Sequence, residues 1–125
     1  MLKLAANFLV GIVALLHVYF VVLEMFLYTK PFGLKTFAQT LEQAQSSAVL
    51  MANQGLYNGF LAAGLVWSLF YSNPATSFEL KMFFLGCVLI AGIYGAYSVG
   101  KSILFFQAVP AALALGIVYL ADRQS

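Results

Sequence analysis

The chain has 125 residues, of which 63% are hydrophobic and 8% are charged. Soluble domains carry roughly 25% charged residues, so this composition excludes a water-soluble protein and indicates one integral membrane domain, residues 1–125, whose main partner is the lipid bilayer. The net charge of +2, without any basic cluster, excludes nucleic acid as an expected partner.

Four apolar runs reach the roughly 20 residues that a membrane-spanning helix needs. In chain order they cover about residues 4–28, 48–71, 78–100 and 103–121. The first run is too long for the core of a signal peptide, which has about 7–15 residues, and no small-residue cleavage site follows it. We therefore predict an all-α fold, a four-helix bundle that stays in the membrane.

The breaks between these runs contain residues that end or begin helices. Pro31 lacks a backbone donor and Gly33 tolerates left-handed geometry, so the first helix should stop there. Residues 34–48 show helical spacing of apolar side chains. This fits a short amphipathic helix at the membrane interface or, as the favoured alternative, a lead-in packed on its own bundle. Asn73-Pro74 predicts a turn, with Ser77 as the cap of the third helix.

The cations do not orient the bundle. Four spans place both termini on one side of the membrane, and the lysine and arginine count is then equal on the two sides. The positive-inside rule therefore predicts no orientation. The cations of the terminal side are Lys3, Lys81 and Arg123, and those opposite are Lys30, Lys35 and Lys101.

Most polar side chains within the predicted spans fall in one leaflet, on the side of the long loop. Glu24 lies roughly 12 Å beyond the centre of the first span, from the helical rise of 1.5 Å per residue. Only His17, near the midplane, and Asn7, at the opposite edge, lie outside this layer. The other helices contribute side chains that we predict to line a pocket: Asn53, Gln54, Tyr57, Asn58, Tyr94, Tyr97 and Gln107. The four from the second span should share one side of their helix.

Glu24 is the most informative residue, because a carboxyl group in a bilayer is costly and is functional by default. The structural alternative is that Glu24 pairs with Lys30 or is held neutral by Asn53 or Tyr57. His17 fits a packing residue as well as it fits a catalytic or proton-relay residue. It is seven residues from Glu24, about 10 Å along the helix, so the two cannot bond directly. One His and one Glu at depth are too few ligands for zinc or iron, so no metal site is predicted.

Four stretches carry a resemblance to a known family: "HVYFVVLEMF", "NQGLYNGFLAAGLVW", "FFLGCVLIAGIYGAYSV" and "FFQAVPAALAL". They resemble family 1304 of the domains of unknown function, small bacterial membrane proteins that are in turn distantly similar to DoxX-like proteins. The resemblance implies a four-helix fold in the bacterial cell (inner) membrane. It implies no settled reaction and names no cofactor, and the DoxX-like link only suggests quinone- or redox-associated chemistry by analogy.

Three functions remain open from the sequence. The first is a polar pocket that binds or converts a small lipophilic molecule with a polar head, in which Glu24 is acid or base and His17 its proton partner. The second is a proton-coupled exporter of the small multidrug type, which would work as a homo-oligomer. The third is an accessory subunit whose polar layer binds a partner helix.

Overall fold

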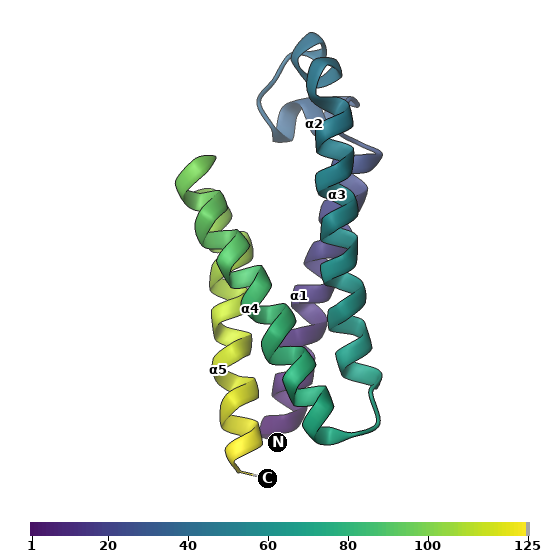
Figure 1. Cartoon of the computed structure of the whole chain (residues 1–125). Coiled ribbons are helices and arrows are strands. Elements are labelled where there is room, and N and C mark those ends of the chain that lie inside the picture. The colour runs from purple at the N-terminus through teal and green to yellow at the C-terminus, as the bar shows by residue number, and fades with distance from the viewer. Residues whose placement is uncertain (125) are drawn as a thin grey trace. The chain divides into compact units, whose positions relative to one another are not determined.

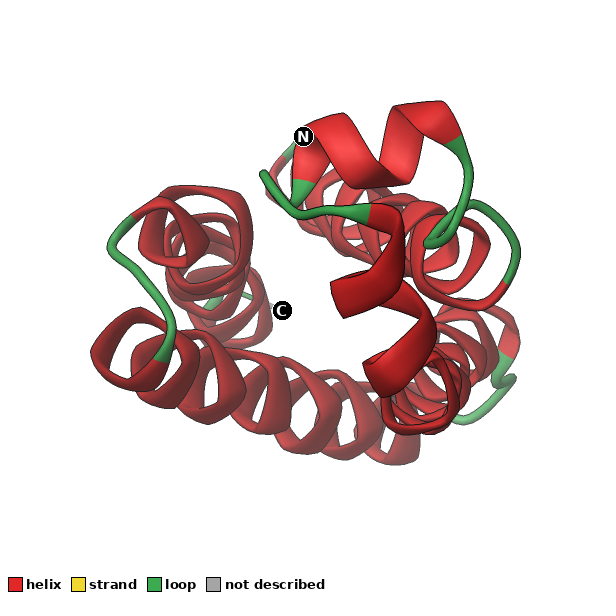
Figure 2. Cartoon of the chain, turned by 90° about the horizontal axis from the view of Figure 1, so that it is seen from above, coloured by secondary structure: helices red, strands yellow, loops and turns green. Residues whose placement is uncertain are grey.

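A computed structural model describes residues 1–124, and these residues are helical without a strand among them (Figure 2). In chain order the elements are α1 (Leu2–Met25), α2 (Pro31–Thr36), α3 (Leu41–Phe70), α4 (Pro74–Ser98), a π-helix η1 (Leu104–Ala108) and α5 (Val109–Arg123). The short α2 lies in the connection between α1 and α3 (Figure 1). The prediction of an all-α fold is therefore confirmed.

Three of the predicted spans are long and apolar enough to cross a membrane. They are Leu2–Met25, Pro74–Ser98 and Leu104–Arg123. The predicted span 48–71 lies in α3, which has 30 residues and is long enough, but its hydropathy falls short. The physical reason is its content of amide side chains, which lowers the mean hydropathy of every window that contains them. The count of four spanning helices is thus not confirmed.

The helix α3 begins at Leu41, earlier than the predicted span 48–71, because a capping box starts it there. Thr40 and Gln43 form a capping box: the Gln43 backbone N–H donates to Thr40 Oγ1 over 3.2 Å, and the Thr40 N–H donates to Gln43 Oε1 over 2.9 Å. This box begins the helix at Leu41, ahead of the apolar run. Residues 34–48 are therefore neither one amphipathic helix nor a simple lead-in. They contain the end of α2, a turn and the start of α3.

The α3–α4 connection corrects the predicted cap of α4. Asn73 is the N-cap, because its side chain accepts a hydrogen bond from the Thr76 backbone N–H over 3.1 Å, and Pro74 occupies the first turn. Ser77 lies within α4 instead, buried, and its hydroxyl donates to the Ser68 carbonyl over 2.7 Å. The asparagine wins this position because the proline directly after it is favoured at the first helical residue.

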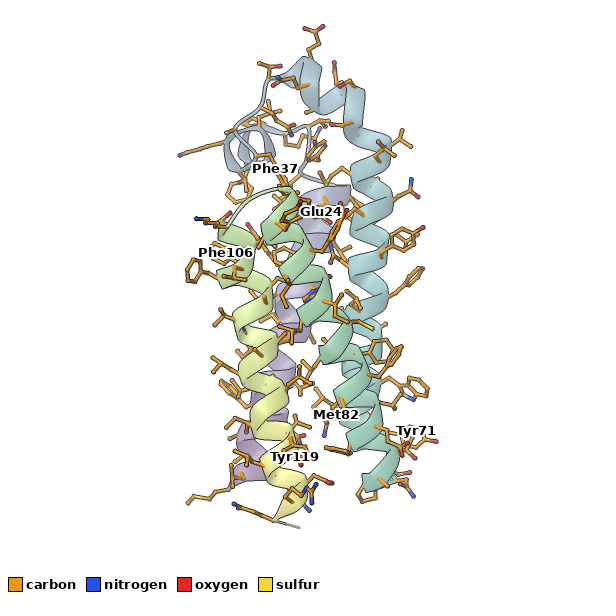
Figure 3. The ribbon with its side chains drawn as sticks, turned by 60° about the vertical axis from the view of Figure 1, so that its left-hand side comes forward. Glu24, Phe37, Tyr71, Met82, Phe106 and Tyr119 are labelled. Carbon is orange, nitrogen blue, oxygen red and sulfur yellow. The ribbon has the colours of Figure 1, made fainter. Side chains whose placement is uncertain are left out.

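The chain forms two compact units, Met1–Leu16 with Leu61–Ser125 (unit 1) and His17–Phe60 (unit 2). The core of unit 1 is built from small and branched side chains of α1, α3, α4 and α5: Ala6, Val10, Val13, Ala14, Leu65, Leu85, Val88, Ala111, Ala114, Val118 and Ala121. Glycines bring its helices together, since a Cβ on Gly92 would lie 2.6 Å from the Ala108 backbone nitrogen. Tyr71 and Tyr119, each partly exposed, lie toward the same end of unit 1 (Figure 3).

Unit 2 contains the end of α1, all of α2 and the first two-thirds of α3. The prediction that the first helix stops at Pro31 and Gly33 is wrong: α1 ends at Met25, and Pro31 begins α2, where proline is favoured in the first turn. The helix α2 folds back closely on the chain before it, and glycine allows this approach because a Cβ on Gly33 would clash with the Leu27 carbonyl oxygen. Gly33 does not have a positive φ, so the need here is for space and not for a left-handed backbone. The predicted polar cluster of α3 and the carboxyl group of α1 both belong to this unit.

Candidate functional site

Glu24 lies in the last turn of α1 with only 7% of its surface exposed. Its two carboxyl oxygens bond to two amide side chains of α3. Gln54 Nε2 donates to Oε1 over 3.1 Å, and Asn58 Nδ2 donates to Oε2 over 2.7 Å. Gln54 and Asn58 are four residues apart and therefore lie on one face of α3, and their bonds to Glu24 show that this face is turned toward the end of α1.

A glycine makes this contact between the two helices close enough. Gly55 is buried, and a Cβ built on it would lie 2.6 Å from Met25 Cγ and 3.1 Å from Glu24 Cβ. Any side chain at this position would require the Met25 side chain to move and would press against Glu24 Cβ. Gly55 lies between Gln54 and Asn58 in sequence, and its lack of a side chain lets their helix come close to the carboxyl group.

The two amide side chains differ in solvent exposure. Asn58 is 9% exposed and its hydrogen bond is the shorter one, whereas the Gln54 side chain is exposed and its bond is longer. An amide can also present its carbonyl oxygen in place of its NH₂ group, so the same pair can bond a carboxylate or a protonated carboxyl group. Glu24 is thus held by one internal partner and one partner at the surface of the chain.

The structural alternatives proposed for Glu24 name other partners. Within residues 1–124 its hydrogen-bond partners are Gln54 and Asn58, and not Lys30, Asn53 or Tyr57. Asn53 bonds to the Val49 carbonyl of its own helix over 3.0 Å, and Tyr57 is 63% exposed.

The expectation that all four polar residues of α3 share one side therefore needs correction. Residues 53 and 57 form one pair and residues 54 and 58 another, and consecutive residues in a helix are rotated by about 100°. Only the second pair bonds to Glu24. A ligand-binding role for Asn53 and Tyr57 stays a prediction.

His17 also belongs to unit 2 and is buried, with its ring packed edge-on against Phe20 at a centroid distance of 5.3 Å. This packing is what a structural histidine would show, and a role as proton partner of Glu24 stays a prediction. In the part of the chain that the structure describes, no three His, Cys, Asp or Glu side chains gather as metal ligands would.

The remaining predicted ligand-binding residues belong to unit 1. Tyr94 and Tyr97 lie near the end of α4 and are largely exposed, while Gln107 is half-buried in η1. Exposed tyrosines are common at membrane–water interfaces, where their amphipathic rings lie at the level of the lipid head groups. Their part in a pocket stays a prediction.

A second polar cluster in unit 2 was not predicted from the sequence. The Tyr28 hydroxyl, on a buried ring, donates to Gln39 Oε1 over 3.1 Å and lies 2.8 Å from Ser47 Oγ. The ring of Tyr28 also packs edge-on against Phe37 at 5.1 Å. The available signal was spacing: Tyr28 follows Glu24 by four residues and Ser47 precedes Gln54 by seven, so each continues a polar stripe.

Comparison with known proteins assigns the chain to a family but not to a reaction. A family model described as protein of unknown function (DUF1304) matches residues 11–119. The chain is similar to the uncharacterized protein YpaA of Lactococcus lactis subsp. lactis (strain IL1403), with 31% identity over 106 residues that cover 83% of this chain and 87% of the relative. No solved structure matches the chain significantly. The chain therefore belongs to the DUF1304 family of proteins of unknown function.

Proposed function

We propose that this protein binds a small lipophilic molecule with a polar head in the membrane, and that Glu24 is the acid or base if the molecule is converted. The observation that carries the proposal is a buried carboxyl group at the end of an apolar helix, with a separate amide donor on each oxygen. Ionisable groups within membrane helices are rare and mark functional sites by default.

The amide that a ligand would replace is that of Gln54. Its side chain is exposed and its hydrogen bond is the longer of the two, while the buried Asn58 keeps the carboxyl group in place. A head-group hydroxyl that donates to Oε1 leaves Glu24 with the same number of hydrogen bonds. The exchange therefore avoids the penalty of an unsatisfied buried oxygen, about 1–3 kcal/mol or more for a charged group.

In a conversion, the hydroxyl proton of the bound molecule moves to Glu24 Oε1 and the head becomes its conjugate base. Glu24 then returns the proton to the product. General acid–base catalysis needs the carboxyl group within hydrogen-bond reach of that proton, which replacement of Gln54 would provide.

The setting that we propose is a four-span bundle in the bacterial cell membrane. A helix of 30 residues is about 45 Å long, from the rise per residue, which exceeds the roughly 30 Å hydrocarbon core. Two of the amide side chains that lower the hydropathy of α3 are those that bond to Glu24. The pairing reduces the cost of placing them in lipid, which supports α3 as the fourth spanning helix.

The test is purification in mild detergent followed by mass spectrometry of the small molecules that remain bound. The wild type is compared with Glu24→Gln and with Glu42→Gln, a matched control at an exposed glutamate on α3. We expect a stoichiometric lipophilic compound in the wild type and the control, and its loss from Glu24→Gln.

Two results would contradict the proposal. One is that all three proteins carry the same compounds in the same amounts, because the carboxyl group would then play no part in binding. The other is that none carries a compound, while proteoliposomes containing the wild type, but not Glu24→Gln, exchange protons for an added lipophilic cation. That result would favour the exporter. A protein that is stable only with a partner chain would favour the accessory subunit.

A further inference from the structure

We propose that Gln39 makes a second hydrogen bond to the molecule bound at Glu24, by donating from its amide to an acceptor oxygen of the polar head. This inference rests on the function proposed above. Its basis is an unusual atom: among the described residues, Gln39 Nε2 is a buried side-chain nitrogen without a hydrogen-bond partner. Such groups are rare in folded proteins, because a buried donor without an acceptor destabilises the fold.

The backbone of Gln39 is held in place by the end of α2. The Gln39 N–H donates to the Leu34 carbonyl over 3.0 Å and the Ala38 N–H donates to the Lys35 carbonyl over 3.3 Å, which together form a Schellman motif. Ala38 takes the left-handed position of this motif, with φ of 50°, where glycine is the usual residue. The chain therefore adopts a less favourable backbone that holds Gln39 in its present position.

The side chain of Gln39 is fixed as well. Its Oε1 accepts the hydrogen bond of the Tyr28 hydroxyl, and Tyr28 in turn contacts Ser47 on α3. With the oxygen engaged, the NH₂ group of the same amide points elsewhere and has no acceptor. An amide held at both its backbone and its oxygen is a preorganised donor.

The site that this donor serves lies in the same unit as Glu24. Tyr28 lies in the turn after α1, four residues beyond Glu24, and Ser47 lies two helical turns, about 10 Å, before Gln54 on α3. The two polar clusters are therefore neighbours along both α3 and the end of α1. The Gln39 nitrogen itself is buried, while the residue as a whole is half-buried and its neighbours Ala38 and Thr40 are exposed. A head group therefore reaches this nitrogen only when the connection between α2 and α3 moves.

The chemistry of the two groups defines the class of molecule. Glu24 accepts hydrogen bonds and so requires a hydroxyl donor, whereas Gln39 Nε2 requires an acceptor such as an ether or carbonyl oxygen. We therefore expect a lipophilic molecule whose head carries both, and we expect the acceptor to increase affinity through Gln39 alone.

Two probes that differ in one atom test this. Delipidated protein is titrated with para-hexyloxyphenol, which has a hydroxyl and an ether oxygen, and with para-heptylphenol, in which a methylene replaces that oxygen. Binding is measured calorimetrically for the wild type, Gln39→Met, Glu24→Gln and Ser47→Ala. The last is the matched control, because it removes a hydrogen bond of the same cluster and leaves the Gln39 amide and its bond to Tyr28 in place.

We expect the wild type and Ser47→Ala to prefer the ether by about two- to tenfold, the effect of one neutral hydrogen bond, and Gln39→Met to bind both phenols equally. The inference would be overturned if Gln39→Met still preferred the ether. It would also be overturned if Ser47→Ala lost this preference to the same extent as Gln39→Met. If Glu24→Gln binds both phenols more weakly than the wild type while Gln39→Met keeps the preference for the ether, only this inference fails. If Glu24→Gln binds both phenols as tightly as the wild type, the proposed function fails with it.

Discussion

Asn58 is the side chain on which the Glu24 carboxyl group depends most. Both residues are buried, and the bond between them is shorter than the one from Gln54. Hydrogen bonds to charged groups contribute about 1.5–3 kcal/mol, and the loss of a partner inside a protein adds the penalty of an unsatisfied oxygen. The partner at the surface can be replaced by water or by a ligand, whereas the internal one cannot.

At this scale we predict that Asn58→Leu lowers the free energy of unfolding by about 2–3 kcal/mol, and that Gln54→Leu lowers it by roughly 1 kcal/mol or less. The physical reason is the difference in burial of the two amides. Unfolding in mixed detergent micelles, followed by circular dichroism, measures both, with Asn53→Leu as the control because that side chain bonds only within its own helix. Equal losses for Asn58→Leu and Gln54→Leu would show that the two bonds are equivalent.

The packing of α3 on α1 is set at Gly55, where the helices are close beside Glu24. One turn later, Gly59 has more room, since a Cβ there would lie 3.5 Å from Val21 Cγ2, an ordinary contact. The two glycines share a helix and a unit but differ in the space around them. They therefore separate the effect of helix propensity from the effect of packing.

For the element scale we expect Gly59→Ala to be neutral or to stabilise the protein by up to about 1 kcal/mol, because alanine favours the helix. Gly55→Ala should instead destabilise it by about 1–3 kcal/mol, because the added methyl group overpacks the contact with Glu24 and Met25. Gly55→Ala should also reduce the amount of bound lipophilic compound. The same unfolding assay checks the pair, and a stabilised Gly55→Ala would mean that the helices separate at little cost.

The whole molecule raises the question of how many times the chain crosses the membrane. Among residues 1–124, three helices qualify by length and hydropathy, and α3 qualifies by length alone. If α3 also crosses, the α2–α3 connection and the α3–α4 connection lie on opposite sides of the membrane. If it does not, they lie on the same side.

We predict opposite sides. Single cysteines are introduced as Gln45→Cys, near the start of α3, and Ser72→Cys, after its end, in a Cys87→Ser background; both positions are exposed. A membrane-impermeant maleimide should label one of them in intact cells and the other only after the membrane is opened. Labelling of both from the same side would rule out α3 as a spanning helix, and Lys101→Cys provides a third position for comparison.

Much of this architecture follows from local properties of the chain. Runs of apolar residues predicted the helices, and Asn73-Pro74 marked the break before α4, because hydropathy and helix termination depend on neighbours in sequence. Pro31 did not mark the end of the first helix, because α1 ends at Met25 and Pro31 begins α2. Glu24, Gln54 and Asn58 were candidates for the same reason, as polar groups in apolar helices. The capping box at Thr40 and Gln43 could also have been recognised from its pattern.

The pairing of these groups could not be predicted in the same way. Whether residues 54 and 58 or residues 53 and 57 face Glu24 depends on the rotation of α3 about its axis, and the close approach of Gly55 to Glu24 and Met25 belongs to the rotation that is observed. The contacts of Tyr28 with Gln39 and Ser47 depend on how α2 folds back, and the Gln39 nitrogen is left without a partner only once those contacts form. Composition and spacing are properties of one segment, while a hydrogen bond between segments depends on the distance and orientation that packing gives them.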